Sequence, residues 1–459
     1  MTTTRPSVAV IGGGISGLVA GYRLRRSLGS DADITVVDDS PRLGGKLRTI
    51  DLGGGPIDIG AEAFIARRPE VPALLAELGL TDQIVHPAGL SPLIWSQGSL
   101  NRLPTGTLMG IPASAESVRD LVDEQTLARI AAEPDVPFEW TRGSDCSVAE
   151  LVSQRFGDQV VSRSVDPLLG GVYSGLAETI GVRAALPTLA AALDAGAQSL
   201  TDAVAAALPT PAPGPVFGAL RGGYGVLLDA LREAADAKFV RGEASGLRRD
   251  GTGWNVDPLG SVDAVILAVP APRAATLLAG VDPKIARIAA RIELASSAVV
   301  ALRLSGKVDL PQNSGILVAT DADLTAKAFT LSSRKWTHLA DRREHLVRVS
   351  FGRFGASEVV DRPDGELIDL ARADLEVVTG ITERPGASFV QRWHGGLPQY
   401  APGHTEIVAE IESEMTQFDG LEVAGSWLHG VGVPACVAVG TTAATRIFER
   451  VARWTHGTP

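Results

Sequence analysis

The sequence is short of the residues that build disulfide frameworks and metal sites. Only two of its 459 residues are cysteine, Cys146 and Cys436, too few for a disulfide framework or a cysteine-based zinc cluster. We expect both to be buried as small apolar side chains in a reducing compartment. The seven histidines are scattered without metal-ligand spacing, so we also expect no metal site.

Long apolar runs are absent as well. No run approaches the roughly 18 residues that a membrane-spanning helix needs. Residues 1–7, MTTTRPS, lack the apolar core of a signal peptide. We therefore expect a cytoplasmic protein whose membrane association, if any, is peripheral.

Basic charge is scarce, and lysine most of all. The formal net charge is −11, and six of the 42 basic residues are lysine. This balance argues against general nucleic-acid binding. An apolar content of 45% is typical of a globular protein with a well-buried core, and the length allows about two or three domains.

What is present begins with glycine. Residues 8–17, VAVIGGGISG, predict a strand, a glycine turn and the start of a helix over 18–28. The G-x-G-x-x-G spacing allows a tight turn, close approach of backbone to a pyrophosphate, and close helix–strand packing. The helix N-terminus then binds the diphosphate; a purely structural glycine turn is the alternative. The candidate contacts are Gly12, Gly13, Gly14, Ile15, Ser16 and Gly17.

A carboxylate follows the next predicted strand, residues 34–37. Asp38 comes 21 residues after Gly17, where it can accept hydrogen bonds from a ribose 2′-hydroxyl and would repel a 2′-phosphate. Asp39 points to the opposite face of the strand, so we expect it to be partly solvated or to hold the loop.

A second glycine signature, PRLGGK at 41–46, comes directly after these acids. Backbone at Gly45 can approach the cofactor, and Arg42 or Lys46 can lie near phosphate. Residues 53–66, GGGPIDIGAEAFIA, predict a strand that returns toward the same site. Its backbone would line the cofactor, and a glycine-rich hairpin is the alternative. The candidate contacts there are Gly60, Ala61, Glu62 and Ala63.

The middle of the chain changes character twice. Residues 87–215 are dominated by helical patterns, and Ser147 with Glu150 has capping-box spacing. A proline-rich linker, PTPAPGP, ends this part. Residues 293–391 predict an antiparallel sheet for substrate binding. The predicted helices are 114–132, 147–157, 184–208 and 222–237, and the predicted strands are 238–247, 253–256, 262–269, 298–304, 315–319 and 345–351.

The C-terminal part repeats the strand, glycine loop and helix order. Residues 421–424 predict a strand, and a long helix follows the loop up to residue 447. Its N-terminus can aim N–H groups at a cofactor ring edge and stabilise negative charge there.

These segments, in this order, resemble the flavin-containing coproporphyrinogen III / protoporphyrinogen IX oxidases of haem synthesis. That family lies within the amine-oxidase-like flavoproteins. The glycine segments at 12–18, 42–46 and 430–432 are shared across the larger group. The more specific matches are DPLLGGVYSG at 166–175, LP at 186–187, LRGG at 220–223, LPQY at 397–400 and GVGVPAC at 430–436.

The resemblance implies FAD as the cofactor and an α/β fold, α+β overall. A Rossmann-like FAD-binding domain would be built from discontinuous segments, with an antiparallel-sheet substrate domain and a helical insert. The implied FAD-binding segments are 1–86, 216–292 and 396–459, the helical insert with part of the substrate domain is 87–215, and the substrate sheet is 293–395.

The resemblance also extends the cofactor site beyond the N-terminal motifs. It places Ala244, Gly425, Val431, Gly432 and Val433 at the cofactor. Three features depart from the family pattern. Residues 60–63 read GAEA where the family often has Gly-Pro-Asp-Ser, Ala435 replaces an acid, and the helical insert is more acidic than in membrane-bound relatives.

The implied activity is oxygen-dependent oxidation of a porphyrinogen. Six electrons would leave in three two-electron steps, with hydride transfer from a meso carbon to the flavin, loss of a pyrrole proton, and release of hydrogen peroxide. The Gram-positive type acts on coproporphyrinogen III, a tetra-anion. Arg67 and Arg68 are candidates to bind it, or form a solvated pair. Trp393 and Tyr400 would line the ring pocket or simply pack. We assign no catalytic residue.

Several alternatives stay open at this point. One is protoporphyrinogen IX oxidation; another is a different flavoenzyme of the same fold, such as an amine oxidase or carotenoid desaturase. A third is a binding protein that has kept the fold without flavin. The pathway implies a downstream ferrochelatase as a partner, and the oligomeric state is left between monomer and homodimer.

Overall fold

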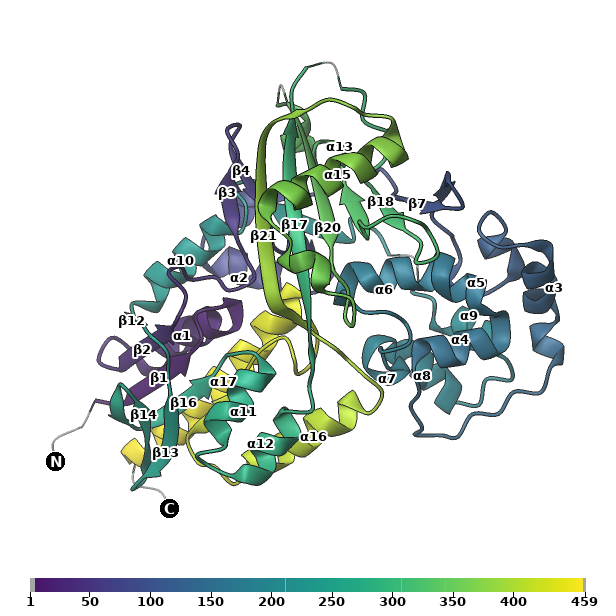
Figure 1. Cartoon of the computed structure of the whole chain (residues 1–459). Coiled ribbons are helices and arrows are strands. Elements are labelled where there is room, and N and C mark those ends of the chain that lie inside the picture. Colours follow the sequence, from purple (N-terminus) through teal and green to yellow (C-terminus); the bar gives the residue numbers. More distant parts are fainter. Residues whose placement is uncertain (1–4, 211, 307, 343, 457–459) are drawn as a thin grey trace.

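The computed structural model describes residues 5–210, 212–306, 308–342 and 344–456. It contains a parallel sheet with flanking helices, a larger mixed sheet above it, and a helical region to one side (Figure 1). The predicted α/β fold class is confirmed.

The parallel sheet is assembled from three distant parts of the chain. Its strand order is β12-β2-β1-β16-β22, and every neighbouring pair is parallel. The central strands are apolar throughout, as expected where a sheet is covered on both faces. The strands are β1 (Ser7–Ile11), β2 (Asp33–Asp38), β12 (Lys238–Arg241), β16 (Ala264–Leu267) and β22 (Leu421–Val423).

The strand predicted over 238–247 is wrong in one respect. It is divided between two sheets: β12 joins the parallel sheet, whereas β13 (Gly246–Asp250) pairs with β14 (Gly253–Asp257) in a small antiparallel sheet. After β12 the chain leaves the parallel sheet at Gly242, whose N–H makes the last contact with β2 by donating to the carbonyl of Asp38 at 2.9 Å. No local pattern marks this change of partner.

The larger sheet has the strand order β21-β17-β20-β19-β18-β7-β8. The predicted antiparallel pairing holds for every pair except β18 with β7, which is parallel. Helix α15 (Asp364–Thr379) packs on one face through an apolar cluster. The strands are β7 (Leu93–Ser96), β8 (Ser99–Arg102), β17 (Leu294–Leu304), β18 (Gly315–Val318), β19 (Ala328–Thr330), β20 (His345–Phe351) and β21 (Pro385–Pro398).

The helical region is more broken than its pattern predicts. The helix expected over 114–132 is a 3-10 turn (Ala115–Val118) followed by α3 (Glu124–Ala132). The helix expected over 184–208 consists of α7 (Val182–Ala185), α8 (Pro187–Asp194) and α9 (Leu200–Ala207). Gly196 ends α8 with a φ of +89°, and Ser199 caps α9 by accepting from the N–H of Asp202 at 3.1 Å.

Other helix predictions are confirmed. Helix α1 (Ile15–Leu28) follows the first glycine turn, and α10 (Gly225–Ala235) follows β11 (Phe217–Leu220). Helix α17 (Val433–His456) follows the last glycine loop. Helix α4 (Val148–Phe156) begins at Ser147, whose hydroxyl accepts from the N–H of Glu150 at 3.1 Å.

Two features bear on how the chain is divided. Strands β7 and β8 belong to the larger sheet although they precede the helical region, and β21 continues past residue 395. Both link parts of the chain that the motifs alone would separate. Within the described ranges, no helix combines the length and the apolar character needed to cross a membrane.

Candidate functional site

The N-termini of helices α1 and α17 lie side by side. Figure 1 shows α17 (yellow) running along α1 (purple). A Cβ atom on Gly440 would overlap the carbonyl of Ser16, so the two helices touch backbone to backbone. Ile15 and Cys436, each in the first turn of its helix, belong to one buried apolar cluster. The two predicted glycine elbows therefore converge in space.

The first elbow has the geometry of a diphosphate cradle. Gly12 adopts a φ of +111°, and a Cβ atom there would overlap the carbonyl of Ala268. A Cβ on Gly17 would overlap the carbonyl of Gly12, whereas at Gly14 the nearest atom would be 3.9 Å away. Helix α1 has no side-chain cap, so its first N–H groups remain available to an anion.

The PRLGGK loop packs directly on this elbow. The N–H of Gly44 donates to the carbonyl of Gly13 at 2.8 Å, and a Cβ on Gly45 would lie 3.1 Å from Gly14 Cα. Only bare backbone fits between the two loops. This close stacking places both glycine segments beside the same anion-binding helix end.

Arg42 and Lys46 differ in what they contact. The Arg42 guanidinium donates to the carbonyls of Gly45 at 2.7 Å and Leu47 at 3.0 Å, and lies 5.7 Å from the Trp393 ring centre. Arg42 thus holds the loop. Burial lowers the pKa of Lys46, and its ammonium has no partner among the described residues. Lys46 is the cation left for an anionic ligand.

Asp38 ends β2 beside the first elbow. Its carboxylate accepts from the N–H groups of Gly13 at 2.6 Å and Ser40 at 2.8 Å. It is partly exposed, while Asp39 is exposed. The neighbouring segment holds Ala244, which is 3% exposed and whose carbonyl accepts from Arg273 at 2.6 Å. Asp38 therefore fixes the turn and still presents its outer side to a ribose hydroxyl.

Residues 60–63 run as bare backbone past Lys46. A Cβ on Gly60 would overlap the carbonyl of Lys46. Trp393 on β21 covers this stretch, since its indole N–H donates to the carbonyl of Ile59 at 3.4 Å. Ala61 is exposed and Ala63 partly so. We call residues 60–63 the backbone track.

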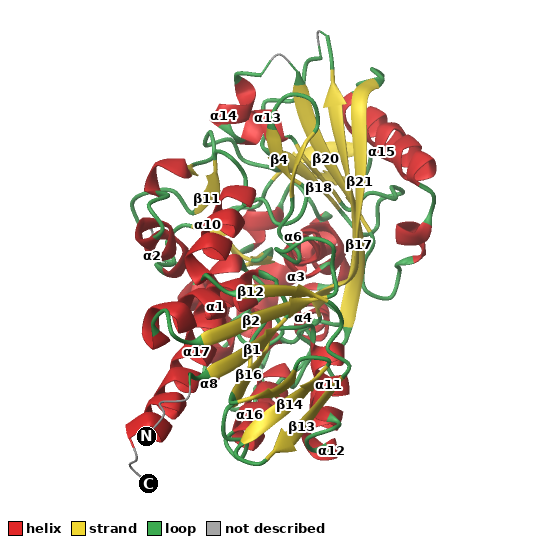
Figure 2. Ribbon diagram, turned by 90° about the vertical axis from the view of Figure 1, so that its left-hand side faces the viewer, coloured by secondary structure: helices red, strands yellow, loops and turns green. Residues whose placement is uncertain are grey.

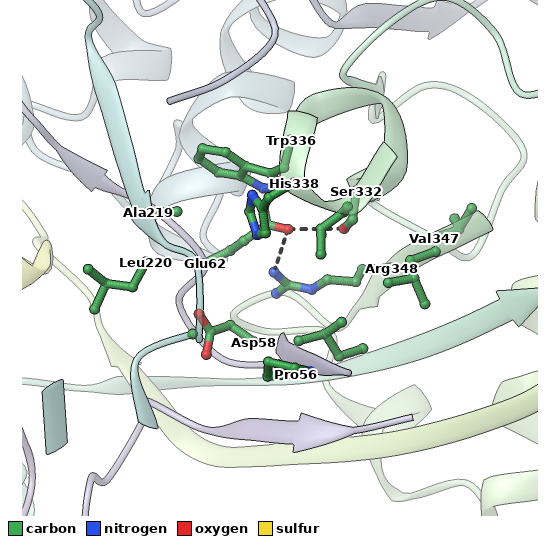
Figure 3. Close-up of a pocket in the computed structure, with 14 residues that line it drawn as sticks. Pro56, Asp58, Glu62, Ala219, Leu220, Ser332, Trp336, His338, Val347 and Arg348 are labelled. Atoms are coloured by element: carbon green, nitrogen blue, oxygen red, sulfur yellow. Dashed lines mark hydrogen bonds and ion pairs between the residues drawn. The ribbon is translucent and has the colours of Figure 1, made fainter. Parts of the chain in front are cut away.

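The side chain of Glu62 leaves the track and turns toward the larger sheet. Figure 3 shows its carboxylate directed at Ser332 and Arg348, 3.0 Å and 3.5 Å away. Lys335 pairs with it at 2.7 Å. Burial opposes ionisation of Glu62, but Lys335 and Arg348 outweigh it and lower the pKa to about 2. A cofactor that lies along residues 60–63 can therefore contact the backbone of Glu62 but not its carboxylate, which points away.

Asp58 lies nearby, on β4 (Pro56–Asp58), and behaves in the opposite way. Burial raises its pKa to about 7, against hydrogen bonds from Thr49 and from the N–H of Tyr224. Asp58 and Glu62 line a cavity of about 20 Å³ (Figure 3). That volume holds about one water molecule, so this cavity is not the cofactor site.

The second elbow is built around Gly425 and Gly430, with φ angles of +142° and +137°. Gly432 is exposed, and the nearest atom to a Cβ there would be 3.7 Å away. Val431 is partly exposed and Val433 is buried at the start of α17. The loop leaves open backbone at its end, as at Gly14.

Tyr400 stabilises this second elbow through two hydrogen bonds. Its hydroxyl donates to the carbonyl of Ser426 and accepts from the N–H of Gly430, both at 2.7 Å. The ring is 2% exposed and stacks on His404 at 3.9 Å. These contacts match the packing alternative rather than the predicted place in the substrate pocket.

Arg67 and Arg68 are occupied by protein partners. Arg67 donates to the carbonyls of Ala212 at 2.8 Å and Gly214 at 3.1 Å. Arg68 pairs with Glu70. In the described part of the chain, neither contacts the backbone track, so no geometry here supports their predicted role toward substrate.

Sequence reasoning missed the residues that join the larger sheet to the backbone track. Arg348 on β20 donates to the carbonyl of Gly60 at 2.7 Å as well as pairing with Glu62. Lys335 on α13 (Ser332–Lys335) is the second cation. Both lie more than 270 positions from Glu62, and no local motif marks either.

Comparison with known proteins agrees with this geometry. The model of the family "Flavin containing amine oxidoreductase" matches residues 15–448. The coproporphyrinogen III oxidase of Mycobacterium bovis is 53% identical over 450 residues, which cover 97% of this chain and 98% of that protein. The coproporphyrinogen III oxidase of Bacillus subtilis is 28% identical over 96% of this chain and 98% of its own length.

A solved structure extends the comparison to the fold. A candidate protoporphyrinogen oxidase from Exiguobacterium superposes with a TM-score of 0.86 at 27% identity, covering 97% of this chain and 99% of that one. The open backbone at Gly14, Ala61 and Gly432, beside the uncapped start of α1 and the start of α17, fits a flavin dinucleotide. The predicted FAD cofactor and the predicted oxidoreductase class are confirmed. The chain belongs to the flavin-containing amine oxidoreductase family.

Proposed function

We propose that the protein oxidises coproporphyrinogen III to coproporphyrin III in haem biosynthesis, with oxygen as electron acceptor. The observation that carries the proposal is the convergence of two glycine elbows and the backbone track on one flavin site. The choice of substrate rests on the relatives named coproporphyrinogen III oxidase, which align over nearly the whole chain.

The chemistry divides between cofactor and protein. Bound FAD supplies the two-electron acceptor. Each of three steps takes a hydride from a meso carbon and a proton from a pyrrole nitrogen, and one oxygen molecule leaves as hydrogen peroxide. The six electrons and six protons removed thus balance three hydrogen peroxide molecules.

The residues of this chain position the cofactor and set its field. The uncapped start of α1 binds the diphosphate, Asp38 the ribose, and Lys46 adds a positive charge. Val431 and Gly432, at the start of α17, would hold the ring system where the helix dipole can stabilise negative charge. Arg348 and Trp393 attach the larger sheet to the track and would keep the backbone there in place for the cofactor.

A paired-substrate assay tests this function. The FAD-loaded protein is given coproporphyrinogen III or protoporphyrinogen IX under air, and porphyrin fluorescence and hydrogen peroxide are followed together. We expect coproporphyrin III with three peroxides per porphyrin. A clear preference for protoporphyrinogen IX would assign this alternative substrate to the enzyme, in line with the name of the Exiguobacterium protein. Inactivity of a flavin-loaded sample with both would reject porphyrinogen oxidation.

A further inference from the structure

Two buried cations lie together where the larger sheet meets helix α6 (Asp166–Tyr173). Lys327 directly precedes β19 and is 7% exposed. Its ammonium donates to the carbonyl of Gly352 at 2.8 Å and to the hydroxyl of Ser174 at 2.5 Å. Arg353 lies just beyond the end of β20 and is partly buried.

Arg353 has unused hydrogen-bonding capacity. Its Nη2 makes a long hydrogen bond, 3.5 Å, to the carbonyl of Val318. Its buried Nη1 has no partner in the described structure. Lys327 uses two of its three N–H donors. Several donors at this point are thus free to bind another group.

The positive charge of the pair is not balanced. Within the described ranges, no carboxylate lies at ion-pair distance from either cation. The acid that interacts with Arg353 is Asp166, and its oxygens accept from the N–H of Ala177 at 2.7 Å and the hydroxyl of Thr320 at 2.8 Å. Burial raises the pKa of Asp166, and Arg353 opposes that rise.

Unpaired buried charge is costly. Charged groups inside proteins are normally paired with opposite charge. Burial and Arg353 lower the pKa of Lys327 to about 7, so each cation makes the charge on the other more costly. An anionic group bound here would relieve the repulsion between the two cations and complete their hydrogen bonding.

The pair is also in reach of the flavin site. Gly352, Ser297 and Trp393 follow one another across β20, β17 and β21, because Ala298 pairs with Phe351 and Ser297 with Trp393. Two strand spacings amount to about 10 Å, a distance that a tetrapyrrole with its side chains spans. Trp393 in turn covers the backbone track.

Helix α6 lies beside the pair. A Cβ on Gly170 would be 3.7 Å from Arg353 Nη1, whereas the next residue, Gly171, is exposed and has no atom within 4 Å of a Cβ built on it. Val172 is 40% exposed despite its apolar side chain. An apolar ring can therefore lie against α6 while an acidic side chain at its rim reaches the cations.

We propose that Arg353 and Lys327 bind one propionate carboxylate of the tetrapyrrole substrate. The inference rests on the proposed function and names a binding site within it. The planar guanidinium presents parallel N–H donors that match a carboxylate, and the lysine adds a third. The site anchors the rim of the macrocycle and leaves the reacting meso carbons to the flavin.

Binding to FAD-loaded protein tests the site separately from turnover. Coproporphyrin III and its uncharged tetramethyl ester are titrated with wild type, Arg353→Gln and Lys327→Gln, and fluorescence quenching is followed. We expect each variant to weaken binding of the acid about 10- to 100-fold and to leave binding of the ester unchanged. Arg353→Lys should recover part of the loss. Arg142→Gln, at an exposed arginine, is the matched control.

The possible failures are distinct. If wild type oxidises coproporphyrinogen III but the variants bind acid and ester as wild type does, or lose both equally, the carboxylate site is rejected and the function stands. If Arg353→Gln does not retain FAD, the comparison of Arg353→Lys and Lys327→Gln decides by the same criterion. If wild type fails to oxidise any porphyrinogen, the proposed function itself fails.

Discussion

The two sheets of this protein make their polar contacts in different ways. Around the parallel sheet, glycines such as Gly14 and Gly432 leave backbone open. On the larger sheet, the contacts come from charged side chains such as Arg348, which pairs with Glu62 and donates to the carbonyl of Gly60. Figure 2 shows the larger sheet above the parallel sheet, with its long strands β17 and β21 extending down alongside the parallel sheet. The difference shows that the geometry at the parallel sheet is specified by local sequence, whereas the geometry at the larger sheet depends on contacts between residues far apart in the chain.

The largest effect should come from closing the backbone cradle. Gly14 has a φ of −74° and free space around its Cβ position, so Gly14→Val should fold and yet block the diphosphate. We expect FAD affinity to fall about 100-fold, the upper range for overpacking. Flavin absorbance after gel filtration measures this. Gly365→Val, at an open exposed position, is the control, and retention of full flavin by Gly14→Val would refute the cradle.

Removing the link between the larger sheet and the backbone track should come next. Arg348→Met leaves the carbonyl of Gly60 without its donor and leaves Glu62 with one cation, Lys335, beside the Ser332 hydroxyl. Breaking a buried pair in this way costs about 3 kcal/mol. Urea unfolding should show the loss, together with weaker FAD binding. Arg372→Met, which breaks an exposed pair with Asp369, should cost about 0.5 kcal/mol or less. Equal effects of the two would contradict the proposed link.

A smaller effect is expected at the second elbow. Tyr400→Phe removes the hydroxyl that bridges Ser426 and Gly430, at a cost of about 1–3 kcal/mol. Because the bridge holds the loop before α17, we also expect a shift of the flavin absorption maximum. Tyr173→Phe, whose ring packs at 5.5 Å from Tyr400, should leave the spectrum unchanged. A normal spectrum in Tyr400→Phe would limit this residue to packing.

The pH dependence of stability separates the two carboxylates beside the track. Folding raises the pKa of Asp58 from 3.8 to about 7, so the folded state holds this proton more tightly. The contribution is complete below about pH 4 and is lost as pH rises through 7. We expect the slope in that window, up to about 1.4 kcal/mol per pH unit, to disappear in Asp58→Asn. Urea unfolding at several pH values measures it.

Glu62 titrates with the opposite sign. Its pKa is lowered from 4.5 to about 2, so its stabilising contribution is present above about pH 4.5 and lost as pH falls toward 2. A variant Glu62→Gln should therefore flatten the acid side of the same profile. Because the charge of Glu62 helps to raise the pKa of Asp58, the slope near pH 7 should move to lower pH in this variant without disappearing. Complete loss of that slope in Glu62→Gln would contradict the separate roles.

The comparison also explains what the sequence could predict. Residues Gly12 to Gly17 and Asp38 were predictable because spacing along the chain fixes their geometry. The pairing of Glu62 with Lys335 and Arg348 was not, since it depends on which strands become neighbours in the larger sheet. For Tyr400 the sequence left open whether the ring lines the substrate pocket or packs, and its burial and its hydrogen bonds to the second elbow depend on distant contacts that no local pattern marks. The split at Gly196 follows from local signals that the helical pattern outweighed, since Gly196 adopts a φ of +89° and Ser199 caps α9.

The central claim is that both glycine elbows hold one FAD. A crystal structure of the FAD-loaded protein tests it most directly. We predict diphosphate oxygens within hydrogen-bonding distance of the N–H groups at Gly14 and Ile15, and the flavin ring against residues 431–433 and the track. A diphosphate bound away from the start of α1, or a ring that does not reach Gly432, would contradict it.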